Sequence, residues 1–310
     1  MSARRHAGAP PAAVEIPRPA AVDLHTHTSR SDGMAEPADL VASAAAAGVR
    51  TLSITDHDTL AGYRELAAEA GASTPGRRLP LELIPGVEIN AVASSVAGLP
   101  EGELHILGYG VDPDDEPFEA LLARQREARV RRFRLLVERL REIGLPIDAQ
   151  IAGLERPDAW SLGRPVAARC LVAAGHAASV ADAFDRILGH GRPGYVPRAG
   201  IGPLEAIAAV RAAGGLAVLA HFSEAPQHRA LLAELHDAGL GGLEVHYLGF
   251  SPATIAGLAI VAAELDLVAT GGSDYHGDLG PYAEAHARLW VPEAAASTLR
   301  AALGREEPHA

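Results

Sequence analysis

Short apolar segments alternate with alanine-rich helical segments along most of the chain, and this alternation limits the possible folds more than any other feature. Seven segments have the length and apolar character of buried strands, and they span residues 21–25, 49–55, 81–89, 103–110, 215–221, 242–247 and 265–272. Helical segments lie between them, at 36–48, 60–71, 203–215, 227–239 and 252–265. Repeated strand–helix units predict an α/β fold with a parallel sheet and helices outside it, and seven such strands favour a barrel over an open sheet.

The middle of the chain breaks this pattern, because no strand signal is found from about residue 112 to residue 194. Residues 118–143 instead predict one long amphipathic helix. The residues at helical spacing on one of its sides are Leu122, Arg129, Phe133, Leu136, Leu140 and Ile143. We therefore expect a disordered tail over residues 1–20, a barrel over 21–111 and 195–310, and a helical insertion over 112–194.

Charge and composition exclude several classes of protein. The net charge is −12, which argues against a general nucleic-acid coat. Residues 121–142 nevertheless hold eight Arg and three Glu. The basic face of this helix is either a solvated surface or a surface that guides an anionic substrate. The chain has no apolar run of 18 residues and no secretory signal pattern, so we expect no membrane span. Its one cysteine, Cys170, permits no disulfide within the chain and predicts a cytoplasmic location.

Histidines and carboxylates recur where the predicted strands end. In a parallel β/α barrel these ends surround one mouth, where function gathers. A lone histidine after a strand is usually a hydrogen-bonded loop residue, but the recurrence over all seven strands is hard to explain in that way. The residues concerned are His25, His27, Asp32, Asp56, His57, Asp58, Glu88, His105, His221, Glu244, His246, Asp274 and His276.

Imidazole and carboxylate together are the ligands of Zn, Mn and Fe, and carboxylate-rich sites favour Mn or Mg. Carboxylates that bridge neighbouring ions are typical of hydrolases with several metals. Six of the histidines, with Asp32, Glu88 and Asp274, make nine candidate ligands, which is enough for three ions. We therefore expect two or three divalent ions per chain, with Mn favoured and Fe, Zn or Mg as alternatives.

Six motifs in this order make the chain similar to the polymerase and histidinol phosphatase (PHP) superfamily. They read DLHTHTSRSDG, ITDHDTLAG, PGVEIN, ELHILGYG, LAH and GGSDYHG, and they span nearly all of the chain after residue 20. The resemblance implies a distorted (βα)7 barrel with a centre of two or three metals at its C-terminal mouth. It implies that His25, His27, Glu88 and Asp274 hold a first ion.

The resemblance also implies the remaining ligands. Glu88 would bridge to a second ion held by His105 and His221, and a third ion would be held by Asp32, His57 and His276. Asp32 stands where some members of the superfamily have histidine. This substitution and the insertion after the HILGYG strand resemble the branch that acts on nucleoside 3′,5′-bisphosphates and 5′-phosphorylated RNA ends. Two departures from that branch are Val166 in GRPV, where histidine is common, and Phe222 in AHF, where proline is common.

These features predict a metal-dependent phosphoesterase, in which metal-bound hydroxide attacks the phosphorus of a nucleoside 3′,5′-bisphosphate or of a short 5′-phosphorylated RNA. Arg164 and Arg198 are candidate phosphate clamps, and Asp56, Asp58 or His246 could move protons or orient ligands. The alternatives are histidinol phosphate, another small phosphomonoester, a cyclic phosphodiester, or a non-catalytic scaffold. No duplex nucleic acid is expected as a partner, and the sequence does not indicate an oligomeric state.

Overall fold

The structure, a computed structural model, describes residues 20–72, 79–93, 102–154, 162–278 and 280–305. The predicted tail over residues 1–20 lies outside this description except for Ala20. Seven strands form one sheet in the order β1 to β7. They are β1 (Val22–Thr26), β2 (Thr51–Ile54), β3 (Glu82–Val92), β4 (Glu103–Tyr109), β5 (Leu216–Leu219), β6 (Gly242–Tyr247) and β7 (Val268–Gly272).

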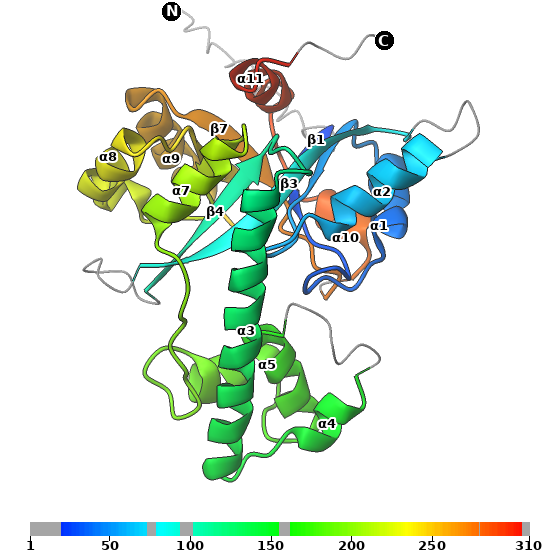
Figure 1. Cartoon of the computed structure of the whole chain (residues 1–310), viewed down its shortest axis with the longest axis vertical. Helices are drawn as coiled ribbons and strands as arrows, with labels where there is room; N and C mark the ends of the chain where they lie inside the picture. Colours follow the sequence, from blue (N-terminus) through cyan, green and yellow to red (C-terminus); the bar gives the residue numbers. More distant parts are fainter. Residues whose placement is uncertain (1–19, 73–78, 94–101, 155–161, 279, 306–310) are drawn as a thin grey trace, which may run out of the picture.

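The helices cover the outside of this sheet and build a second lobe (Figure 1). Around the sheet lie α1 (Pro37–Ala46), α2 (Ala61–Ala72), α7 (Pro203–Ala212), α8 (Arg229–Asp237), α9 (Pro252–Glu264), α10 (Tyr282–His286), α11 (Ala294–Ala302) and the short turn η2 (Ala225–Gln227). The second lobe holds α4 (Asp148–Ala152), α5 (Arg164–Ala173), α6 (Val180–Ala183) and η1 (Phe184–Leu188), and α3 (Glu116–Glu142) runs into it from the barrel. Among the described residues, none of these helices is both long and apolar enough to cross a bilayer.

The sheet closes on itself where β1 meets the segment that follows β7. The amide of His27 donates to the carbonyl of Tyr275 at 2.9 Å, and the amide of Asp274 donates to the carbonyl of His25 at 2.7 Å. The predicted seven-strand barrel with outer helices is therefore confirmed.

The prediction of a wholly parallel sheet is wrong at one strand. β4 runs antiparallel to both β3 and β5, while the other neighbouring strands are parallel. The physical reason is the connection that precedes it. A parallel strand needs a crossover of a dozen or more residues, usually helical, and only residues 93–102 separate β3 from β4.

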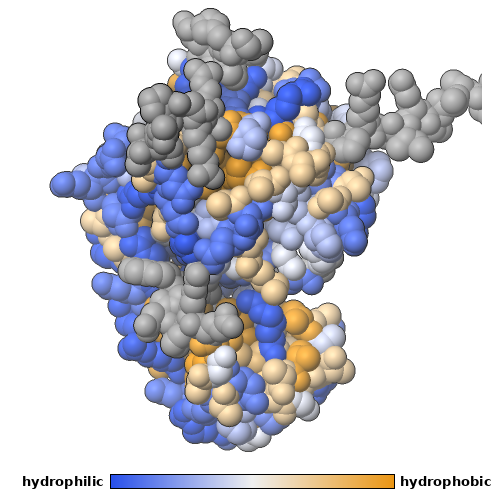
Figure 2. All heavy atoms as spheres, turned by 90° about the vertical axis from the view of Figure 1, so that its right-hand side faces the viewer, coloured by the Kyte–Doolittle hydropathy of each residue, from blue (hydrophilic) through white to orange (hydrophobic). Residues whose placement is uncertain are grey.

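The long helix α3 belongs to both lobes. It starts with Asp115, whose side chain accepts from the amide of Phe118 at 2.7 Å, as expected for an N-cap. Phe118 and Leu122 pack in the barrel core, whereas Phe133 and Leu140 pack in a separate apolar cluster with α5 and η1. Figure 2 shows the lower lobe from the side, with apolar residues on its surface. The insertion thus has its own core, and α3 belongs to both this core and the core of the barrel.

The arginines of α3 do not form a single basic face. Arg126, Arg129 and Arg132 are buried and point toward the barrel, whereas Arg131 and Arg139 are exposed. The alternative of a solvated surface therefore applies to the exposed arginines, and the alternative of a guide for an anionic substrate applies to the buried ones.

Barrel closure leaves no room beside His25. A Cβ added at Gly272 would lie 2.4 Å from both the amide nitrogen and the Cβ of His25. We expect Gly272→Ala to lower the free energy of unfolding by about 1–3 kcal/mol, because the seam must open to admit the methyl group. Urea denaturation would measure this change. The matched control is Gly257→Ala in α9, where the nearest atom is 3.6 Å away and alanine should be neutral or slightly stabilising; equal stability of the two variants would contradict the expectation.

Candidate metal centre

The nine candidate ligands of the sequence lie together at one mouth of the barrel. β1 carries His25, and His57, three residues after β2 ends, forms a parallel bridge with Glu88 inside β3. His105 stands near the beginning of β4, not at its end. Because β4 runs antiparallel, its beginning lies at the same mouth, so the expected convergence holds although the strand direction differs.

The first group of side chains surrounds the Nε2 atoms of the H-x-H pair. Nε2 of His25 lies 3.4 Å from Oε2 of Glu88 and 3.3 Å from Oδ1 of Asp274. Nε2 of His27 lies 3.2 Å and 3.1 Å from the same two oxygens. Four ligand atoms are therefore close enough to hold one cation.

The second group uses the other oxygen of Glu88. Oε1 of Glu88 lies 2.6 Å from Nδ1 of His105 and 3.1 Å from Nε2 of His221. The two nitrogens are 3.1 Å apart. Glu88 thus presents one oxygen to each of two groups, which is the geometry of a bridging carboxylate.

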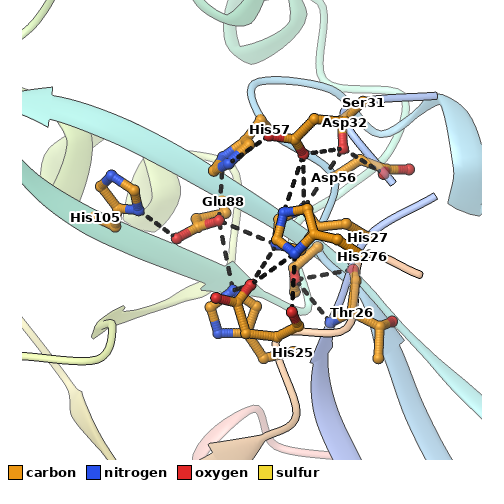
Figure 3. Close-up of polar contacts among 12 residues, drawn as sticks. His25, Thr26, His27, Ser31, Asp32, Asp56, His57, Glu88, His105 and His276 are labelled. Atoms are coloured by element: carbon orange, nitrogen blue, oxygen red, sulfur yellow. Dashed lines mark hydrogen bonds and ion pairs between the residues drawn. The ribbon is translucent and has the colours of Figure 1, made fainter. Parts of the chain in front are cut away.

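The third group centres on Asp32. Its oxygens lie 3.2 Å from Nε2 of His276 and 3.5 Å from Nε2 of His57. Nδ1 of His27 is 3.7 Å from Oδ1 of Asp32, so His27 borders this group as well as the first. Figure 3 shows how these rings surround Glu88 and Asp32.

These residues fit divalent ions on two observations. The buried atoms Nε2 of His25, Nε2 of His27 and Nδ1 of His57 have no hydrogen-bond partner among the described residues, and each faces a carboxylate oxygen. Buried polar atoms are normally satisfied, so three such atoms in one cluster indicate that something else completes them. The donor set of imidazoles and carboxylates suits Mn, Fe or Zn.

The electrostatics keep the carboxylates ionised. Burial alone would raise the pKa values of Glu88 and Asp274, but the surrounding histidines overcome burial and hold both pKa values below their usual range. For His276 burial opposes the charged form, yet Asp32 and Asp274 raise its pKa to about 10. Burial lowers the pKa of His57 well below its usual value. The carboxylates are therefore in the form that binds cations at neutral pH.

Backbone strain also gathers here. Four described residues other than glycine have positive φ, and three of them are Asp58 (53°), His221 (28°) and Asp274 (51°). Such conformations cost energy and persist only where the surroundings enforce them, and they cluster at functional sites.

Glu244 is a site residue that the sequence placed at a strand end without giving it a role. Its Oε1 lies 2.9 Å from Nδ1 of His25, and its Oε2 accepts from the amide of His221 at 2.7 Å. It is fully buried. A carboxylate on the far nitrogen of a ligand histidine fixes the orientation of the ring and raises its basicity.

A bulge in β6 decides which side chains after Glu244 face the centre. The pairing of β6 with β7 shifts between Glu244 and His246. His246 therefore turns away and packs on Trp290, with ring centroids 5.0 Å apart. Tyr247 faces the centre instead and donates its hydroxyl hydrogen to Oδ2 of Asp274 at 3.1 Å. Burial and the neighbouring carboxylates raise the pKa of Tyr247, so it stays a neutral donor.

Asp56 and Asp58 are both buried, and their contacts are those of positioning groups. Asp56 accepts from the amide and hydroxyl of Thr28 and from the hydroxyl of Ser31, each at 2.7 Å. It thereby holds the turn that carries Asp32. Asp58 pairs with Arg129 at 2.7 Å.

The two candidate phosphate clamps meet at Glu103. Arg198 lies 3.2 Å and Arg164 3.6 Å from Oε2 of Glu103, and Arg132 lies 3.2 Å from Oε1. Three guanidinium groups around one carboxylate leave an excess of positive charge. Burial lowers the pKa of Arg198 to about 10, so it remains protonated at neutral pH.

A cavity of about 240 Å³ lies between Arg164 and the second group. Its lining residues are Glu103, Leu104, His105, Arg164, Ala220, His221 and Phe222. Of the two departures noted in the sequence, Phe222 therefore lies at the cavity, beside His221. Val166 packs in the core of the insertion instead.

The chain is similar to known proteins over most of its length. A model of the PHP domain matches residues 23–167. The chain is 38% identical over 274 residues to the 5′-3′ exoribonuclease Rnm of Salmonella typhimurium, which covers 87% of this chain and 89% of that protein. It is 31% identical over 261 residues to the 3′,5′-nucleoside bisphosphate phosphatase of Chromobacterium violaceum, covering 82% and 87%.

A solved structure has the same architecture. The crystal structure of a candidate metal-dependent phosphoesterase from Bifidobacterium adolescentis matches with a TM-score of 0.74 and 32% identity. The match covers 90% of this chain and 95% of that one.

Glu244 offers a test of the centre that leaves its nine candidate ligands in place. We expect Glu244→Gln to weaken Mn²⁺ binding by about 10- to 100-fold, because the amide cannot hold His25 as the carboxylate does. Titration calorimetry would measure the affinity. The matched control is Glu264→Gln, which changes a half-exposed carboxylate paired with Arg229 far from the mouth. Unchanged affinity in Glu244→Gln would contradict the assigned role.

Proposed function

The chain belongs to the PHP-domain family, and from this premise we propose that it is a metal-dependent phosphoesterase that hydrolyses phosphate esters of nucleotides. One observation carries the proposal. Three groups of ligand atoms lie side by side, two of them share Glu88, and Arg164 lines the same cavity as His105 and His221 of the second group. Cations beside an arginine suit a substrate that carries more than one phosphate charge.

We assign the ions to the three groups as the sequence predicted. His25, His27, Glu88 and Asp274 would hold the first ion, Glu88, His105 and His221 the second, and Asp32, His57 and His276 the third, with His27 in reach. Manganese is the ion we propose, on the carboxylate content of the groups. When bound, such ions supply Lewis-acid polarisation of the phosphoryl oxygens and activation of a water nucleophile.

The exposure of the side chains indicates the side from which the substrate approaches. His25 and Glu88 are buried, with 0% and 1% of their side chains exposed. His105 and His221 are 23% and 27% exposed, and Asp274 is 20% exposed. His276 of the third group is 21% exposed. The second group has the two most exposed ligands and shares a cavity with Arg164, so we place the scissile phosphate on that side.

The protein's own residues bind and orient the substrate. Arg164 and Arg198 would bind its phosphate oxygens, with Glu103 holding their guanidinium groups in place. Tyr247 and Glu244 would fix Asp274 and His25. We propose no role in binding or catalysis for His246, because the bulge turns its ring toward Trp290.

The substrates we propose are a nucleoside 3′,5′-bisphosphate and a short RNA with a 5′ phosphate. Both carry a second phosphate at the distance of one nucleoside from the first, and both fit the names of the relatives. A duplex is not proposed, because the chain carries a net charge of −12. The cytoplasmic location predicted from the single cysteine fits substrates of this kind.

Phosphate release is the direct test. We expect the Mn²⁺-loaded protein to release phosphate from adenosine 3′,5′-bisphosphate and mononucleotides from a 5′-phosphorylated pentaribonucleotide. His25→Ala should lose at least about 100-fold in kcat, because the first group loses a ligand. Metal content measured in parallel separates loss of metal from loss of chemistry. Hydrolysis only of histidinol phosphate or of a cyclic phosphodiester would overturn the nucleotide assignment and leave the metal centre standing.

The arginine cluster makes a separate prediction about binding. Arg198→Met should raise KM for the bisphosphate by about 10- to 100-fold, because one charged hydrogen bond to phosphate is lost. Arg186→Met is the matched control, since Arg186 is 55% exposed and pairs with Asp182 on the insertion. Steady-state kinetics would show the difference. An unchanged KM in Arg198→Met would mean that the cluster is structural.

A further inference from the structure

The helix α3 contacts the metal centre through buried side chains that the proposed function leaves unused. Gln125, Arg126 and Arg129 are each 6–7% exposed although two of them carry a full charge. All three reach out of the insertion helix and bind the ends of β2 and β3. These are the strand ends that deliver His57 and Glu88.

The contacts to the β2 end fix a strained residue. Arg129 donates to Oδ2 of Asp58 from Nη2 at 2.7 Å and from Nε at 3.3 Å, and Arg126 donates to the carbonyl of Asp58 at 2.8 Å. Asp58 has φ of +53°, and its amide donates to the carbonyl of Glu88 at 2.9 Å. Its other oxygen, Oδ1, is buried and has no hydrogen-bond partner in the described part of the chain. The two arginines therefore hold both the charge and the backbone of the residue directly after His57.

The contacts to β3 hold Asn90, which lies two residues after Glu88. Arg129 also donates to Oδ1 of Asn90, and the side-chain nitrogen Nδ2 of Asn90 lies 2.6 Å from Nε2 of His105. Gln125 donates to the carbonyl of Asn90 at 3.0 Å. The guanidinium group of Arg129 thus joins Asp58 to Asn90. Asp58 directly follows His57 of the third group, and the side chain of Asn90 contacts His105 of the second group.

We propose that Arg129 is a positioning residue through which the helical insertion sets the geometry of the second and third metal groups. A guanidinium group is suited to this task, because its planar fork binds two acceptors at once. The ammonium group of lysine can pair with Asp58 but cannot hold Asn90 in the same way. The inference rests on the proposed metal centre and goes beyond it, because it makes ion binding in the barrel depend on the insertion.

Ion binding itself is the test. We expect Arg129→Met in the full-length chain to bind fewer Mn²⁺ ions per chain at a given free concentration, with at least one dissociation constant raised about 10- to 100-fold. Titration calorimetry and the metal content after gel filtration would measure this, and the electron paramagnetic resonance of coupled Mn²⁺ ions would report the changed spacing. Arg131→Met is the matched control, since Arg131 is 64% exposed on the same helix and should bind ions like the wild type.

Arg129→Lys keeps the test decisive if the methionine variant does not fold. It retains the positive charge beside Asp58, and we expect it to fold and still to bind Mn²⁺ more weakly than the wild type. Wild-type affinity and stoichiometry in Arg129→Lys, or in folded Arg129→Met, would overturn the inference. A loss of the same size in Arg131→Met would also overturn it, because the effect would then come from helix charge. Failure of the wild type to bind Mn²⁺ would instead overturn the proposed metal centre, and this inference with it.

Discussion

The buried carboxylate of Glu88 is the interaction on which the site depends. It lies within 3.4 Å of five imidazole rings, those of His25, His27, His57, His105 and His221. A lone ionised carboxylate at 1% exposure would be costly, and the same is true of a cluster of histidines without a counter-charge. The carboxylate and the histidines therefore stabilise one another, and cations bound between them would supply partners for both. The barrel is the frame that brings the five rings, which lie on or after β1, β2, β4 and β5, to this one residue of β3.

The irregularities of the frame serve that convergence. An antiparallel β4 brings the beginning of a strand, with His105 and Glu103, to a mouth otherwise built from strand ends. Because of a bulge in β6, the side chain of Tyr247 faces the metal centre and that of His246 does not. Positive φ values occur at two candidate ligands, His221 and Asp274, and at Asp58, which directly follows a third, His57. A regular barrel would place fewer of these groups at one point.

The sequence was sufficient for those parts of the molecule that depend on local pattern. The seven strands and the main helices follow from apolar periodicity, and the nine candidate ligands follow from their recurrence after strands and from the motifs. The direction of β4 and the bulge in β6 could not be read in this way, because both depend on pairing with neighbouring strands. For the same reason Tyr247 was missed and His246 was expected in its place. The partners of Arg129 were also hidden, since a helical pattern shows which side of α3 is apolar but not which strand end an arginine reaches.

Barrel closure has a consequence for how the molecule is made. The seam joins the first strand to the last, and Asp23 and Ser273, which are hydrogen-bonded across it, are 250 residues apart in the chain. His25 and Asp274 sit on the two sides of that same seam and also belong to the first metal group. During synthesis, a ribosome must therefore release nearly the whole polypeptide before the first cation site exists. Until then the histidines of β1 lack their last carboxylate, so a nascent or truncated chain would be without its complete first ion site. The first ion site is therefore complete only when the seam of the barrel closes.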